Sequence, residues 1–336
     1  MRTRKLLGAG ALLLVLLAAA YSIWWWWAAG TVERGILAWM EERRAEGALV
    51  EHQGLSVGGF PFALRATVEA PHLAMRGMEW QGTRLVAEAP PWDYRRVALA
   101  LPGEHRLTLI QPGQLPLVLL ARGGGQGHTL LTLAGQPLEL RLTFADLIAQ
   151  PEVAPTAIAA LELTASRPST PPASHTETGL TLALSATEVI LPEGTPAVLG
   201  QTIRQAGAAL RVQGTPPGLE PASLSAWSRD GGTVEVDRLA LDWGPATVTM
   251  QGTLALDAEL QPQAAMSAEL SGTDALLTAL QPQLRPNQVA MARTVVTMLA
   301  RPDANGRPVI QAPVTVQNGA LFLGPLKLLP MPRIDW

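Results

Sequence analysis

The 336-residue chain contains no cysteine. This absence excludes disulfide bonds, thiolate nucleophiles and cysteine-based zinc or iron–sulfur centres. The five histidines lack the close spacing that places two metal ligands on one element: His52, His72, His105, His128 and His175. We therefore expect no metal site and no cofactor.

Positive charge is also scarce beyond the first five residues. Without Arg2, Arg4 and Lys5, 22 of the 25 basic residues remain against 28 acidic ones, which gives a formal charge of -6. Binding to a nucleic-acid backbone needs a basic surface. Nucleic acid is therefore not an expected partner.

Catalytic motifs are incomplete. The string from Gly54 through Ser56 to Gly58 matches the G-x-S-x-G pattern of a nucleophile elbow, in which a tight turn joins a strand to a helix. Here Gly59, Phe60 and an alternating segment follow, and this pattern does not favour a helix. We predict that the protein is not an enzyme, assign no catalytic residue, and keep hydrolysis by Ser56 as the last alternative.

An uncharged stretch runs from Leu6 to Ala29. As a helix rising about 1.5 Å per residue it would span roughly 36 Å, enough to cross a hydrocarbon core of about 30 Å once. Its basic flank lies on the N-terminal side, so the positive-inside rule makes residues 1–30 a cytoplasmic tip and transmembrane anchor. We predict a single-pass protein of the inner (cytoplasmic) membrane with its C-terminal bulk in the periplasm.

The uncharged stretch contains four consecutive tryptophans: Trp24, Trp25, Trp26 and Trp27. Indole rings favour the headgroup layer, and we place all four at the outer interface. Ala18 and Ala20 before Tyr21 leave a cleaved signal peptide as the competing interpretation, although the apolar run exceeds the roughly 7–15 residues of a signal peptide. Residues 31–47 continue as an amphipathic juxtamembrane helix.

From Ala48 onward apolar and polar residues alternate, which is the pattern of strands with one buried and one wet face. One-sided alternation favours antiparallel pairing, because strands of a parallel sheet are covered on both faces. Between Thr233 and Trp243 the alternation changes phase. A β-bulge near Asp237 and Arg238 would return both apolar sets to one face.

The predicted fold class is mainly β, with a transmembrane helix followed by curved antiparallel sheets that form a groove or a sandwich. Proline and small polar residues accumulate over residues 167–178, so we predict a flexible linker between a first β-rich half, 48–166, and a second, 179–336. The Asn318-Gly319 dipeptide predicts a tight hairpin. Helices are expected to be few and short: 196–205, 221–227 and, within 273–300, Thr273–Gln281 and Asn287–Ala300.

A local signature runs from Gly58 to Phe62 and continues through Pro71, Leu73 and Trp80. Together with the ending Val314–Pro330, it resembles DUF2125, a family of uncharacterised membrane-anchored exported proteins from alphaproteobacteria. The resemblance implies an exported, β-rich protein and brings no catalytic residues. More distantly, the anchor, amphipathic strands and closing hairpin are similar to AsmA-type envelope proteins, in which such strands form an apolar groove for lipids.

We interpret the signature residues as structural: Gly59, Phe60, Pro61, Phe62, Pro71 and Leu73. Gly59 permits a positive φ and Pro61 fixes φ, so the two phenylalanines would lock the turn into the core.

The abundance of medium-sized apolar side chains on one side of many strands predicts a protein that binds or transfers lipid or another hydrophobic ligand. One strand supplies the candidate groove residues: Val248, Met250, Leu254 and Leu256. The same side chains would equally fill a closed sandwich. An envelope scaffold or assembly factor that binds protein partners is the alternative.

Overall fold

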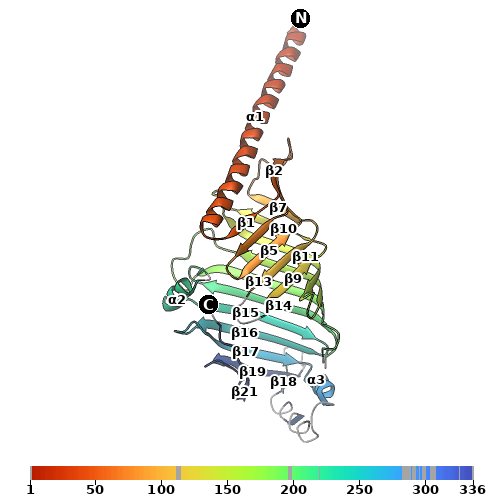
Figure 1. The fold of residues 1–336 in the computed structure, drawn as a ribbon, viewed down its shortest axis with the longest axis vertical. Coiled ribbons are helices and arrows are strands. Elements are labelled where there is room, and N and C mark those ends of the chain that lie inside the picture. The colour runs from red at the N-terminus through yellow and green to blue at the C-terminus, as the bar shows by residue number, and fades with distance from the viewer. Residues whose placement is uncertain are drawn as a thin grey trace.

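The structure is a computed structural model that describes residues 2–110, 115–195, 199–218, 220–281, 289, 293–294, 296, 300–302, 308–324 and 326–334. Figure 1 shows a long N-terminal helix followed by strands that succeed one another along the long axis, away from the N-terminus. In the described residues, 21 strands form one sheet with antiparallel pairings. The predicted mainly β, antiparallel fold is confirmed.

The N-terminal helix α1 (Arg2–Ala45) is continuous over 44 residues, so the expected anchor and juxtamembrane helix form one element. It contains no proline, the residue that breaks helices most strongly. α1 is long and apolar enough to cross a membrane. It ends in a left-handed turn at Gly47 (φ 90°), where the Ala48 N–H donates to the Arg43 carbonyl at 3.0 Å.

The first ten strand segments are five long strands, each broken once by one to three residues. Their bounds are β1 (Leu49–Glu51) and β2 (Gly54–Gly58), β3 (Leu64–Glu69) and β4 (His72–Met75), β5 (Met78–Gly82) and β6 (Arg84–Ala89), β7 (Arg96–Leu101) and β8 (His105–Leu109), β9 (Leu117–Ala121) and β10 (Gly125–Leu131). The breaks lie side by side in neighbouring strands, because the Ala70 N–H donates to the Thr83 carbonyl and the Thr83 N–H to the Glu104 carbonyl. We call this line of breaks the crease.

The crease divides the part of the sheet nearest α1 into two arms. One arm is β2-β3-β6-β7-β10 and the other is β1-β4-β5-β8-β9. Both arms join β11 (Pro137–Ala149), whose Phe144 pairs with Gly125 and whose Leu147 pairs with Ala121. At the crease Gly124 has a φ of 75°, and a Cβ there would lie 1.9 Å from the Leu101 carbonyl oxygen. Only glycine fits this position without rearrangement.

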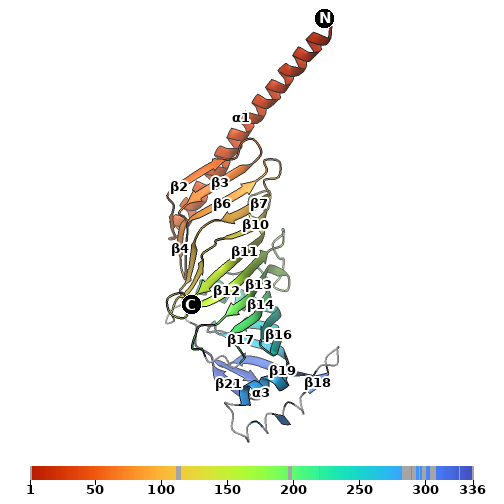
Figure 2. The same cartoon turned by 90° about the vertical axis from the view of Figure 1, so that its right-hand side faces the viewer.

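Beyond β11 the sheet continues as a meander, which Figure 2 shows as a twisted layer. Its strands are β12 (Thr156–Ser166), β13 (Thr178–Ile190), β14 (Thr202–Gln213), β15 (Val234–Trp243), β16 (Ala246–Leu256), β17 (Pro262–Ser271), β19 (Pro308–Gln317), β20 (Ala320–Leu323) and β21 (Leu326–Pro330), with β18 (Ala300–Pro302) paired to the start of β19. Helix α2 (Pro221–Arg229) lies between β14 and β15, and α3 (Thr273–Leu280) follows β17.

Two predictions from local sequence are confirmed. Val236 pairs with Gly252 and Leu239 with Met250, so a β-bulge occupies the two intervening positions. The Asn318-Gly319 dipeptide, with φ values of 52° and 64°, turns the chain so that Gln317 pairs with Ala320. Both features depend on neighbouring residues alone, which is why the sequence predicts them.

Helices and the domain division follow less directly. α2 and α3 match the expected helices at 221–227 and Thr273–Gln281. The helix expected over 196–205 is wrong for Thr202 onward, which begins β14, and the one over Asn287–Ala300 lies mostly outside the described residues. Residues 167–177, the main part of the expected linker, connect β12 to β13, and these two strands pair with each other, so the sheet continues past them.

Candidate functional site

Strand register extends one apolar face across the sheet. Directly paired residues of neighbouring strands lie on the same face. Val248 pairs with Leu241 and Leu270, and Met250 pairs with Leu239 and Ala268. Step by step the same face includes residues of the central strands: Leu140, Leu142, Leu161, Leu163, Leu182, Leu184 and Leu210. We call this the apolar face; Thr247, Thr249 and Gln251 lie on the opposite, polar face.

At the end nearest α1 the apolar face lies inside the crease, beneath this helix. Met40 of α1 packs on Val50 and Val68, which come from different arms, and all three are buried. A cavity of about 250 Å³ lies in this region. Its apolar lining comes from α1 and both arms: Ile36, Trp39, Met40, Val50, Ala66, Val68, Leu73, Trp80, Leu85 and Ala87. The two arms therefore fold toward each other with their apolar side inward.

Farther from α1 the apolar face is uncovered within the described residues. Most of its central leucines are partly exposed, and Leu184 is 43% exposed. Val248, Met250, Leu254 and Leu256 lie in a row on β16 and are also partly exposed. Side chains at the centre of a closed sandwich would instead be buried by a facing sheet. The described strands have the geometry of an open apolar surface at these positions.

The polar face carries ion pairs between neighbouring strands. Each joins an arginine to a carboxylate: Arg65–Glu88, Arg84–Glu69, Arg141–Glu162, Arg204–Asp242 and Arg211–Asp237. The Arg211 Nε lies 2.9 and 2.8 Å from the two Asp237 carboxylate oxygens, and this hydrogen bonding lowers the pKa of Asp237. Charged groups therefore mark the polar face as the one in contact with water.

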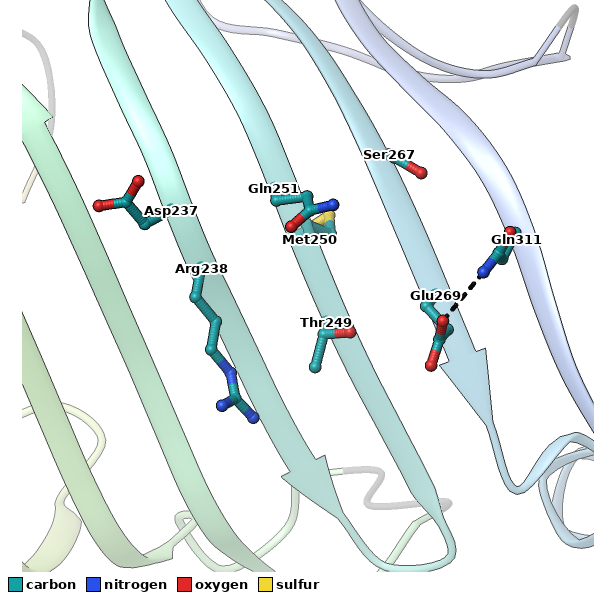
Figure 3. Close-up of a pocket in the computed structure, with 8 residues that line it drawn as sticks. All are labelled: Asp237, Arg238, Thr249, Met250, Gln251, Ser267, Glu269 and Gln311. Carbon is teal, nitrogen blue, oxygen red and sulfur yellow. Dashed lines mark hydrogen bonds between the residues drawn. The ribbon is translucent and has the colours of Figure 1, made fainter. Parts of the chain in front are cut away.

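A hollow of about 510 Å³ lies on the polar face next to the bulge. Figure 3 shows Asp237 and Arg238 on β15 and Glu269 two strands away on β17, while Met250 lies behind the ribbon at Gln251. The Gln311 side-chain amide donates to Glu269 at 3.1 Å, and Asp237 is already paired with Arg211. No group of three potential metal ligands occurs among the described residues. The hollow therefore offers dispersed polar groups and not a convergent site.

The four tryptophans differ in their surroundings. Trp24, Trp26 and Trp27 are exposed, whereas Trp25 is 1% exposed and packs with Ala29 and Leu64. The placement of the four tryptophans at a membrane interface stays a prediction, but the Trp25 side chain contacts the sheet and is covered by it. Its indole Nε1 donates to the Ala63 carbonyl at 3.1 Å. The other three indoles remain exposed on α1.

The signature turn between β2 and β3 also departs from expectation. Gly59 has the expected positive φ (101°), and the Phe60-Pro61 bond is cis. However, Phe60 is 48% and Phe62 is 74% exposed, so the expectation that they enter the core is wrong. The Phe60 ring instead contacts Trp25 of α1, edge to face at 5.4 Å. The Phe60 side chain of this turn therefore packs on the helix and not in the interior of the sheet.

Pro71 and Leu73 hold structural positions. At the crease the Pro71 carbonyl accepts a hydrogen bond from the Gly82 N–H of the neighbouring strand, and Leu73 packs against the cluster beneath α1. Ser56 lies in the middle of β2, exposed on the polar face and paired with Thr67. A turn and strand β3 follow it, so the strand–turn–helix geometry of a nucleophile elbow does not occur there.

His105 is a buried residue that the sequence did not single out. It is 4% exposed and stacks on Trp80, with ring centroids 5.8 Å apart. Neither ring nitrogen forms a well-aligned hydrogen bond within the described residues, and burial lowers the pKa of His105. Register places it on the apolar face, opposite Gly82. Only the three-dimensional pairing distinguishes it from the other scattered histidines.

A family model described as "Uncharacterized protein conserved in bacteria (DUF2125)" matches residues 25–332. No curated protein and no solved structure matches the chain. The similarity to AsmA-type envelope proteins therefore stays a prediction.

Proposed function

The chain belongs to the DUF2125 family of uncharacterised bacterial proteins, and we propose that it is an inner-membrane protein whose periplasmic sheet binds or transfers lipid, or another hydrophobic ligand, along the apolar face. No catalytic step is part of this proposal. The observation that carries it is the continuous apolar face, which begins beneath α1 and remains uncovered over the central described strands.

The physical support is the asymmetry between the two faces. Contact of an acyl chain with the apolar face removes apolar surface from water, at about 0.8 kcal/mol per buried methylene. The ion-paired polar face has no such gain, because its charged groups are already hydrated. A ligand with a long hydrocarbon chain therefore suits one face and not the other.

Lipid bound to the full-length protein is the direct test. We propose to extract the protein in mild detergent and to quantify co-purified lipid by mass spectrometry. Met250→Asp introduces a charge on the apolar face and should lower the lipid content several-fold. Gln251→Asp, the next residue on the same strand but on the polar face, should leave it unchanged.

Two further results decide between the alternatives. If Met250→Asp does not fold, Leu184→Gln supplies the same test at a more exposed position. Wild-type protein without lipid, stably associated with other envelope proteins, would contradict lipid binding and support the scaffold. Labelling of Ser56 by a serine-reactive probe would instead support the hydrolase.

Topology has its own test. The basic residues before the apolar run predict a cytoplasmic N-terminus, so alkaline phosphatase fused after Trp336 should be active. An inactive fusion would contradict the proposed orientation, and a mature protein beginning near Tyr21 would show that the helix is a cleaved signal.

A further inference from the structure

The β2–β3 turn, residues 59–63, exposes aromatic surface without any charge. Its sequence is Gly-Phe-Pro-Phe-Ala, and Phe62 at its tip is 74% exposed. On the adjacent helix Trp26 and Trp27 are 67% and 64% exposed. Exposed aromatic residues gathered at one level of a molecule mark an interaction surface.

The turn is held at a defined level of α1. The Tyr21 hydroxyl donates to the Pro61 carbonyl, and the Trp25 indole donates to the Ala63 carbonyl. The Phe60 ring lies 6.3 Å from the Tyr21 ring and 5.4 Å from the Trp25 ring. These contacts span one turn of the helix, so the phenylalanines cannot move along α1 without losing them.

That level coincides with the outer boundary of the bilayer. Counting from Leu6, Tyr21 lies roughly 22 Å and Trp25 roughly 28 Å along the helix axis. A hydrocarbon core of about 30 Å therefore ends close to the turn. On the side of α1 that faces the sheet, lipid exposure also ends there, because Trp25 and Ala29 are covered by the sheet.

We propose that the β2–β3 turn is a second membrane contact, with Phe60 and Phe62 seated in the outer headgroup layer of the bilayer that α1 crosses. This inference rests on the proposed membrane anchoring. The occupant is the phospholipid leaflet, because the turn lies beside the exposed tryptophans of the membrane-spanning helix and carries no charge that would oppose insertion. Figure 2 shows the turn at the top of the sheet, between β2 and β3 beside α1.

A second contact changes what the anchor does. A single helix would leave the whole molecule free to tilt in the bilayer, whereas a second contact beside the helix restricts this tilt. On the apolar face, Leu64 follows the turn directly and Val57 lies two residues before it, and both pack in the α1 cluster. The apolar face would then begin at the leaflet surface, where acyl chains are present.

Because the chain contains no cysteine, a single introduced cysteine can be labelled specifically. Single-cysteine variants Phe62→Cys, Leu133→Cys and Leu14→Cys of the full chain are labelled with an environment-sensitive fluorophore. They are reconstituted into phosphatidylethanolamine–phosphatidylglycerol vesicles with or without lipid carrying a spin label near the headgroup. Leu133 is the matched control: it is 78% exposed in the β10–β11 turn, at the same end of the strands. Four strand spacings, roughly 19 Å, separate it from the β2–β3 turn.

The Phe62 probe should show blue-shifted emission and strong quenching by the shallow spin label, and the Leu133 probe should show neither. Absence of quenching at Phe62, or equal quenching at Leu133, would overturn the second contact. The Leu14 probe lies within α1 and reports the anchor, using a spin label deep in the acyl chain. Quenching at Leu14 without quenching at Phe62 would support the membrane anchor and contradict the second membrane contact. Absence of quenching at Leu14 would contradict both the anchor and the second contact.

Discussion

The part of the sheet proximal to α1 and the part distal to it share one alternation pattern, but their apolar side chains have different surroundings. In the proximal part the crease folds the face inward, and Val50 and Val68 are 5% and 7% exposed beneath α1. In the distal part Leu184, on the same face, is 43% exposed. The comparison teaches that alternation specifies which side is apolar, whereas covering elements decide whether that side is a core or a surface.

The largest expected effect comes from introducing a charge on the apolar face, once in the proximal part of the sheet and once in the distal part. Val68→Asp buries a carboxylate with no partner in the cluster, and should destabilise the protein by several kcal/mol or raise the pKa of the new carboxyl strongly. Leu184→Asp leaves its carboxylate in contact with water and should lower the melting temperature little. Equal losses in thermal melts of the detergent-purified chain would show that the distal face is also a core.

A second substitution separates the crease from an ordinary turn. Gly124→Ala should cost about 1–3 kcal/mol or more, since its Cβ would clash with the Leu101 carbonyl in addition to the strain of a positive φ. Gly135 has a similar φ of 79° but nothing within 4 Å of its Cβ position. Gly135→Ala should therefore cost only about 1 kcal/mol in denaturant unfolding. If the two variants lose equal stability, close packing at the crease is not what requires glycine.

The third prediction concerns pH, and it arises in the proximal part because His105 is buried there. Burial lowers the folded-state pKa of His105, so below about pH 6.5 the unfolded chain binds a proton that the folded chain does not. His105 should thus destabilise the protein as pH falls from that value toward the folded pKa, by about 1.4 kcal/mol per unit of lowering at most. His105→Phe keeps the stacking on Trp80 and should remove this part of the pH dependence. Melting temperatures from pH 5 to 8 that fall identically in both proteins would refute the assignment.

The smallest effect is expected on the polar face. Arg211 lowers the pKa of Asp237, so the pair contributes stability above the unfolded pKa of that carboxyl and loses it as pH falls further. Both side chains are about 40% exposed and screened by solvent, and Arg211→Gln should change stability by no more than about 1 kcal/mol. A much larger loss in urea unfolding would mean that the polar face is itself covered.

The sequence predicted the features that depend on adjacent residues and missed those that depend on covering elements. The bulge at Asp237 and Arg238 follows from a change of phase along one strand. By contrast, Ala70 at the crease has a φ of 44°, which no rule for alanine predicts. Phe60 and Phe62 are expected in a core because phenylalanine is large and apolar. In the structure only the Phe60 ring contacts α1, through Trp25.

The burial of Trp25 had a signal in the sequence. Successive residues of a helix are rotated by about 100°, so four consecutive tryptophans point in nearly all directions around the axis. A helix that also packs against a sheet must therefore turn one of them inward. For the apolar face no such signal exists, because Leu184 and Val68 occupy equivalent positions in their strands.

The meander also determines how the chain can be assembled. In the described sheet most strands pair with strands that lie close to them along the chain, such as β12 with β13 and β16 with β17, whereas β17 pairs with β19 across the longer segment 272–307. Under the proposed topology the N-terminus is anchored first, and the strands reach the far side of the membrane in the order in which they pair. Local pairing needs little loop closure, and N-terminal parts generally fold first during synthesis. The protein is thus suited to fold strand by strand during its export, with each new strand added to an edge that already exists.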